Sequence, residues 1–147
     1  MVSLYESRIE RVGPLVGDLF ERGDLVVLFA SCAPTELWDI SVLHGHPGYD
    51  GGLEPGDVLG IAGQEYTVVA VGDVALKNFR ELGHLVLKFS DSVRVELPGQ
   101  VNVVPRSLPV LNPGDLITVR HSCYSGGPVG PRGVSAEDVS EATGTRE

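Results

Sequence analysis

Short apolar runs, separated by turns that contain Gly or Pro, occupy most of the first 121 residues. Several of these runs alternate apolar and polar side chains, a pattern typical of a strand with one buried face. The pattern predicts strands over residues 3–12, 24–30, 42–46, 58–62, 65–71, 84–90, 93–97, 101–104 and 116–121. Many short strands joined by such turns are typical of a β-barrel or a β-sandwich.

Three short segments predict helices instead. Residues 15–22 place apolar side chains on one helical face, and Pro34 suits the first turn of a helix that runs through Trp38. A third helix is expected over residues 75–82, with Gly83 ending it. We therefore predict a mainly β domain with a few short helices.

The tripeptide Pro-Gly-Asp occurs at residues 55–57 and again at 113–115, each time just before a predicted strand. Two identical turns would be consistent with duplicated hairpins. However, Pro, Gly and Asp are ordinary turn residues, and no repeat of solenoid length is visible. We therefore favour the simpler interpretation that the tripeptide is a preferred turn.

The character of the chain changes at Ser122. Residues 122–147 are rich in Ser, Gly and Pro and contain few apolar residues, a composition typical of a flexible tail. We expect a single compact domain over residues 1–121, followed by this tail over residues 122–147.

The charge of the chain argues against one class of function. The 147 residues carry a formal net charge of -9, and they show no cluster of Lys and Arg of the kind that binding to nucleic acid requires.

Neither a signal peptide nor an apolar stretch of membrane-spanning length is visible. Cys32 and Cys123 are too far apart to define a disulfide framework or a zinc site. We expect a cytoplasmic protein that does not insert into the membrane.

Two of the four histidines form the sequence His44-Gly45-His46. Residues i and i+2 of a strand point to the same face, so the two imidazoles are expected to lie on one side. A neutral imidazole is a nucleophile near pH 7 and can carry a phosphoryl group, while a second ring binds the phosphoryl oxygens or orients the first. A His-x-His pair is also a common pair of metal ligands. It can equally be two polar residues at the end of a strand.

The other two histidines give weaker signals. His84 follows Gly83 and begins an apolar strand, so we expect its ring to bond to the backbone. If it faced the same pocket as His44, it could contact a phosphate. His121 ends the last predicted strand, and we expect it at the surface. The sequence contains no motif of nucleotide-binding proteins or serine hydrolases.

Longer segments carry a specific resemblance to a known family. The sequence LEPGDVLGIAGQEYTVVAVGDVALKNFRELGHLVLKF at residues 53–89 closely resembles the core of the glucitol/sorbitol-specific enzyme IIA family of the bacterial sugar phosphotransferase system (PTS). CAPTELWDISVLHGH at residues 32–46 is similar to the family's segment that leads to its phosphorylated histidine. Farther on, ELPGQVNVVP and LNPGDLITV are similar to the family's closing strands. The resemblance covers residues 2–119.

This resemblance implies a compact β-barrel and a phosphotransferase component that needs no cofactor. The phosphohistidine carrier HPr would donate the phosphoryl group, and a cysteine of the membrane-associated enzyme IIB/IIC components would accept it, during uptake of a polyol such as glucitol (sorbitol). The family's active-site histidine maps onto His44, and its second histidine maps onto His46, a neighbour of the site.

The histidine of the family's Gly-His pair maps onto His84, a candidate phosphate contact. Few basic residues lie near the histidine pair in the sequence, so we expect backbone N–H groups and imidazoles to stabilise the phosphate. The alternative function is a non-catalytic metal-binding or regulatory β-barrel that uses His44 and His46 as ligands.

Overall fold

The computed structural model describes residues 5–121, which form eight strands and three short helices. The tail expected over residues 122–147 lies outside the described residues. Among residues 5–121, no helix is long and apolar enough to cross a lipid bilayer. The helices are α1 (Val16–Gly23), the 3-10 helix η1 (Thr35–Ile40) and α2 (Ala75–Leu82). The strands are β1 (Tyr5–Val12), β2 (Leu25–Ala30), β3 (Ser41–His44), β4 (Val58–Ile61), β5 (Gln64–Val71), β6 (Leu85–Phe89), β7 (Gln100–Val104) and β8 (Leu116–Arg120).

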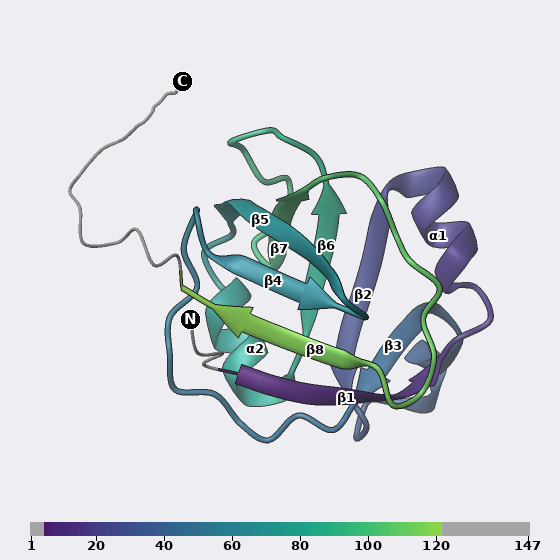
Figure 1. Ribbon diagram of the computed structural model, residues 1–147. Helices are drawn as coiled ribbons and strands as arrows, with labels where there is room; N and C mark the ends of the chain where they lie inside the picture. Colours follow the sequence, from purple (N-terminus) through teal and green to yellow (C-terminus); the bar gives the residue numbers. More distant parts are fainter. Residues whose placement is uncertain (1–4, 122–147) are drawn as a thin grey trace.

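The eight strands close into a barrel in the order β1-β3-β2-β6-β7-β5-β4-β8, and β8 returns to pair with β1 (Figure 1). The pairs β2·β3 and β6·β7 are parallel, whereas the other six pairs are antiparallel. Closure of the sheet selects the barrel over the sandwich. The predicted fold class, a mainly β barrel with a few short helices, is confirmed.

Alternating side chains from the strands fill the barrel. Along β6, for example, Leu85, Leu87 and Phe89 are buried, and the residues between them are partly exposed. Each α-helix buries one aromatic ring against this core, Phe20 from α1 and Phe79 from α2. The two helices lie on different sides of the barrel (Figure 1). Burial of these faces, rather than intrinsic propensity, stabilises helices of only two turns.

One predicted strand is wrong. Residues 93–97 alternate in polarity but form a loop, in which Val93 is 80% exposed and Leu97 is 53% exposed. The loop joins β6 to β7, and these two strands pair directly with each other. The other edge of β6 is occupied by β2. No edge of β6 is therefore free to accept the alternating segment as a further strand.

The barrel consists of two halves with the same order of elements. The segment β1-α1-β2-β3 matches β5-α2-β6-β7, since β1·β3 and β5·β7 are both antiparallel and β2·β3 and β6·β7 are both parallel. A constant shift of 59 positions relates the halves, as from Gly13 to Gly72 or from Phe20 to Phe79. The equivalent strands β2 and β6 pair with each other where the halves meet.

Backbone hydrogen bonds repeat between the two halves. The N–H groups of Gly13 and Gly72 donate to the first residues of β3 and β7 at 3.0 and 2.8 Å. The two Pro-Gly-Asp turns are equivalent as well, because Gly56 and Gly114 both have a φ of +97° and donate to matching residues of β5 and β1. The interpretation of this tripeptide as merely a preferred turn was therefore wrong. The two turns mark duplicated halves.

The glycine that precedes each α-helix offers a test of this packing. A Cβ atom at Gly72 would overlap the carbonyl groups of Leu97 and Pro98, so Gly72→Ala should lower the free energy of unfolding by about 1–3 kcal/mol. The control is Gly17, inside α1, where a Cβ atom would meet nothing within 4 Å. Gly17→Ala should leave the stability unchanged or raise it by up to about 1 kcal/mol. Chemical denaturation measures both, and equal stabilities would contradict the packing.

Candidate functional site

A cluster of polar side chains lies on the inner side of the barrel where β1 and β3 pair. In β3, Val42 packs in the main core, whereas Leu43 packs outward beneath η1. Alternation therefore turns His44 inward, and in β1 it turns Tyr5 and Ser7 inward in the same way. His44 is 0% exposed. An ionisable ring this deep in a barrel requires a hydrogen-bond partner at each polar atom.

Both nitrogens of the His44 ring have such partners. Nε2 lies 2.9 Å from the carbonyl oxygen of Gly83. A carbonyl only accepts, so Nε2 carries the proton. Nδ1, which is unprotonated in the neutral ring, lies 2.9 Å from the hydroxyl of Ser7 and 3.4 Å from that of Tyr5. The surroundings thus select one neutral tautomer, whose lone pair faces two hydroxyl groups.

His46 lies beside this ring, just beyond the end of β3. The strand predicted over residues 42–46 stops at His44, whose carbonyl accepts from the N–H of His46 at 3.0 Å. The Nε2 of His46 donates to the carbonyl of Arg80 at 3.0 Å, and its Nδ1 accepts from the hydroxyl of Tyr5 at 2.6 Å. The two ring centroids are 5.9 Å apart. The histidines are therefore neighbours, as expected, but a turn rather than an extended strand places the second one.

Gly83, which ends α2, contacts both histidines. Its φ of +61° lies in the left-handed region that glycine adopts without strain. A Cβ atom there would lie 2.9 Å from Cβ and Cγ of His46 and 3.0 Å from Cε1 of His44. The sequence identified this residue only as the end of a helix. The structure adds that no side chain fits between the helix and the two rings.

Burial dominates the electrostatics of the site. It lowers the pKa of His44 below the usual 6.5, and the hydrogen bond to Gly83 and the charge of Glu10 only partly oppose this, while His46 adds to it. Burial also raises the pKa of Tyr5 to about 12. Near neutral pH the His44 ring is therefore uncharged and nucleophilic, and the Tyr5 hydroxyl keeps its proton and donates it.

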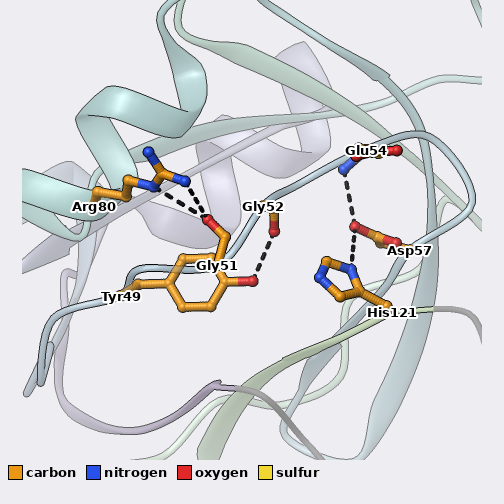
Figure 2. A network of polar contacts seen from close by, with 7 residues as sticks. All are labelled: Tyr49, Gly51, Gly52, Glu54, Asp57, Arg80 and His121. Carbon is orange, nitrogen blue, oxygen red and sulfur yellow. Dashed lines mark hydrogen bonds and ion pairs between the residues drawn. The ribbon is translucent and has the colours of Figure 1, made fainter.

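The loop that follows the histidine pair is held at several points (Figure 2). The guanidinium of Arg80 donates twice to the carbonyl of Gly51, at 2.7 and 3.1 Å, and the hydroxyl of Tyr49 donates to the next carbonyl at 2.6 Å. At the end of the loop, Asp57 pairs with His121 at 2.9 Å. Arg80 therefore makes two contacts around the site. Its carbonyl accepts a hydrogen bond from His46, and its guanidinium donates to the loop.

His84 lies apart from the pair. Its Nδ1 donates to the carbonyl of Leu28 at 3.1 Å, and its ring packs on Phe29 with centroids 4.5 Å apart. Phe29 belongs to the outer cluster beneath η1, not to the main core. His84 therefore makes the expected hydrogen bond to the backbone. Its ring lies on the outer side of the barrel sheet, whereas the ring of His44 lies on the inner side.

The metal alternative gains no support from the described residues. Within residues 5–121, no group of three or more His, Cys, Asp or Glu side chains is arranged to hold a metal ion.

Two residues of the candidate site, Tyr5 and Ser7, were not predicted from the sequence. Both lie on one face of the predicted strand over residues 3–12, but alternation alone does not say which strand that face will meet.

Comparison with solved structures gives the class of protein. The fold matches the crystal structure of a PTS system IIA component from Enterococcus faecalis V583 with a TM-score of 0.69 and 25% sequence identity, over 76% of this chain and 96% of the other. The barrel is therefore that of a phosphotransferase-system protein.

Sequence comparison gives the family. The family model of the PTS system glucitol/sorbitol-specific IIA component matches residues 4–118. The glucitol/sorbitol-specific EIIA components of Shigella flexneri and Escherichia coli (strain K12) are each 32% identical over 117 residues, which make up 80% of this chain and 94% of the relative. The chain belongs to the glucitol/sorbitol-specific IIA family and is a phosphocarrier of PTS sugar uptake.

The contact of Gly83 with the histidines can be tested by adding one methyl group. Gly83→Ala should shift the ring resonances of His44 and His46 and lower stability, because the new Cβ would press on both rings. The matched control is Gly63→Ala: Gly63 also has a positive φ, +88°, but open space around its Cβ position. It should lower stability and leave both rings unperturbed. Equal ring shifts in the two variants, measured by NMR, would contradict the contact.

The lowered pKa of His44 predicts a pH dependence of stability. Because the folded state binds this proton less readily than the unfolded state, the free energy of unfolding should fall as the pH drops below about 6.5, toward the lower folded-state pKa. His44→Gln should flatten this part of the profile. Denaturant titrations between about pH 7.5 and 5.5 measure the slope. Identical slopes in both proteins would show that His44 titrates normally.

Proposed function

We propose that His44 accepts a phosphoryl group from the phosphohistidine of HPr and passes it to the cysteine of the enzyme IIB component, during uptake of a polyol such as glucitol (sorbitol). The observation that carries this proposal is the neutral His44 ring, held at both nitrogens beside two hydroxyl groups. The family resemblance maps the phosphorylated histidine onto the same residue. Membership of a IIA family supports the proposed transfer to IIB.

The chemistry suits a carrier. An uncharged imidazole offers a lone pair to phosphorus, and the product is a labile phosphoramidate that can be passed on. Such a transfer asks the protein mainly for positioning and for stabilisation of charge on the phosphoryl oxygens. The lowered pKa of His44 keeps the ring neutral at cellular pH. The Ser7 hydroxyl, 2.9 Å from Nδ1, supplies a hydrogen-bond donor beside the ring.

Burial of His44 has two consequences for this proposal. The ring is 0% exposed, so docking of the donor must uncover it. Each hydrogen bond that holds the ring contributes only about 0.5–1.5 kcal/mol net, an amount that contacts with a partner protein can offset. Between encounters, the same burial would shield the phosphorylated ring from water and from loss by hydrolysis.

His46 acts in this proposal as a positioning residue. Its Nδ1 accepts from the Tyr5 hydroxyl at 2.6 Å, and this bond holds the Tyr5 oxygen 3.4 Å from Nδ1 of His44. It makes no hydrogen bond to the His44 ring itself among the described contacts. Removal of His46 should therefore slow transfer without abolishing it.

The proposal predicts the outcome of phosphorylation with phosphoenolpyruvate, enzyme I and HPr. The wild-type protein should gain one acid-labile phosphoryl group in intact-protein mass spectra, and His44→Gln should gain none while remaining folded. His46→Gln should still be phosphorylated, but at a rate lowered about tenfold or more, as expected when a positioning contact is lost.

The control is His84→Gln, because the ring of His84 lies in the outer cluster with Phe29. This variant should be phosphorylated at the wild-type rate. Stoichiometric phosphorylation of His44→Gln, or loss of phosphorylation in His84→Gln with His44 intact, would refute the assignment of the acceptor.

A further inference from the structure

We propose that the hollow between α1 and the loop that joins β7 to β8 is a docking site for a partner protein that presents an aromatic ring between basic side chains. None of the residues that line this hollow belongs to the histidine site, so the proposal stands whether or not His44 carries the phosphoryl group. It comes from a comparison of the two halves of the barrel. One half joins its loop to a helix with its own side chains, and the other half leaves the corresponding place open.

In the first half of the barrel, side chains fasten the loop over residues 45–57 to α2. The ring of Tyr49 packs on that of Phe79, with centroids 5.4 Å apart. The guanidinium of Arg80 donates to the carbonyl of Gly51 at 2.7 and 3.1 Å. An aromatic ring and a guanidinium therefore join this loop to its helix.

The corresponding loop of the second half, residues 105–115, runs beside α1 (Figure 1). A hollow of about 470 Å³ lies between them. The shift of 59 positions that relates the two helices places Phe20 at the position of Phe79. It places Glu21 at the position of Arg80. Because a carboxylate only accepts hydrogen bonds, Glu21 cannot donate to a loop carbonyl as Arg80 does.

The lining of the hollow defines the chemistry of its occupant. Its apolar wall includes Val16, Phe20, Leu108 and Leu111. The exposed side chains of Asp18 and Glu21 add two carboxylates, and neither forms an ion pair within residues 5–121. The guanidinium of Arg106, which packs on Phe20, is paired with Asp24 instead. A ring flanked by cations is therefore the complementary group.

Apolar surface continues from this hollow across α1. On the rim of the hollow, Val110 is 82% exposed. A second hollow of about 220 Å³, lined by Leu15, Leu19 and Ile40, shares Asp18 with the first. An exposed apolar surface of this kind is typical of a protein-binding site, and aromatic and arginine side chains contribute most of the binding energy in such sites.

Charge selects a partner protein over the chain itself. The whole chain has a formal net charge of -9, and residues 122–147 contain more acidic than basic side chains. A second copy, or the chain's own C-terminal segment, would therefore bring further negative charge to Asp18 and Glu21. A basic partner is instead attracted by the same carboxylates, which raises its rate of association.

The first experiment titrates the whole ¹⁵N-labelled chain with the peptide N-acetyl-Arg-Phe-Arg-amide. We expect saturable shifts of the amide resonances of α1 and of residues 108–111. Two control peptides, in which Gly replaces Phe or Glu replaces both Arg, should bind at least about tenfold more weakly, because they lack the ring or the charge. No saturable shift at the hollow, or equal binding of the control peptides, would overturn the proposal.

The second experiment tests the place of binding with substitutions in α1. A Cβ atom at Gly17 meets nothing within 4 Å, so Gly17→Trp adds a ring that enters the hollow and should abolish binding of the peptide. Gly17→Ala should keep the affinity within about twofold. Asp18→Asn combined with Glu21→Gln should weaken binding by about threefold or more, as expected for two exposed ion pairs. Wild-type affinity in Gly17→Trp, or in the double variant, would overturn the proposal.

Spectra recorded without the peptide complete the test. The ring resonances of His44 should be unchanged in every variant, which separates loss of docking from loss of the fold, and the double variant decides if Gly17→Trp fails to fold. Resonances of the hollow that move with protein concentration would assign the surface to a second copy. Nuclear Overhauser effects between residues 122–147 and α1 would assign it to the chain's own C-terminal segment. Either result would overturn the proposal.

Discussion

The site depends on one hydrogen bond, from Nε2 of His44 to the carbonyl of Gly83. His44 belongs to the first half of the barrel and Gly83 to the second, so the bond crosses between the duplicated halves. Because a carbonyl only accepts, this contact sets the tautomer, the orientation of the ring and the direction of the free lone pair. The close packing of residue 83 against the two rings also explains why it is glycine, since a Cβ atom there would press on both histidines.

The same backbone frame occurs twice within residues 5–121, but the histidine pair occurs in one half of it. The positions equivalent to His44 and His46 in the second half are Val103 and Pro105, and neither side chain can accept a phosphoryl group. The position equivalent to the glycine that ends α2 is Asp24, which keeps the left-handed conformation with a φ of +58° and pairs with an arginine. The two halves thus share the backbone of the barrel, and the residues of the candidate site belong to one place on it.

The sequence predicted the helices and strands better than it predicted which strands pair with each other. Alternation and turn residues identified the barrel strands, and the spacing of His44 and His46 identified the pair. The strand predicted over residues 93–97 failed because its neighbours in the chain pair with each other, which local pattern does not reveal. Tyr5 and Ser7 were missed for a related reason: which strand faces which is decided only when the barrel closes.

The central claim is that the buried His44, held across the junction of the two halves, is the residue that carries the phosphoryl group. Its most direct test is localisation of that group after phosphorylation by HPr, by digesting the protein at neutral pH and fragmenting the peptides without loss of the P–N bond. The account predicts that the phosphoryl group is found on His44. Its presence on His46, His84 or a cysteine, with His44 unmodified, would contradict the account.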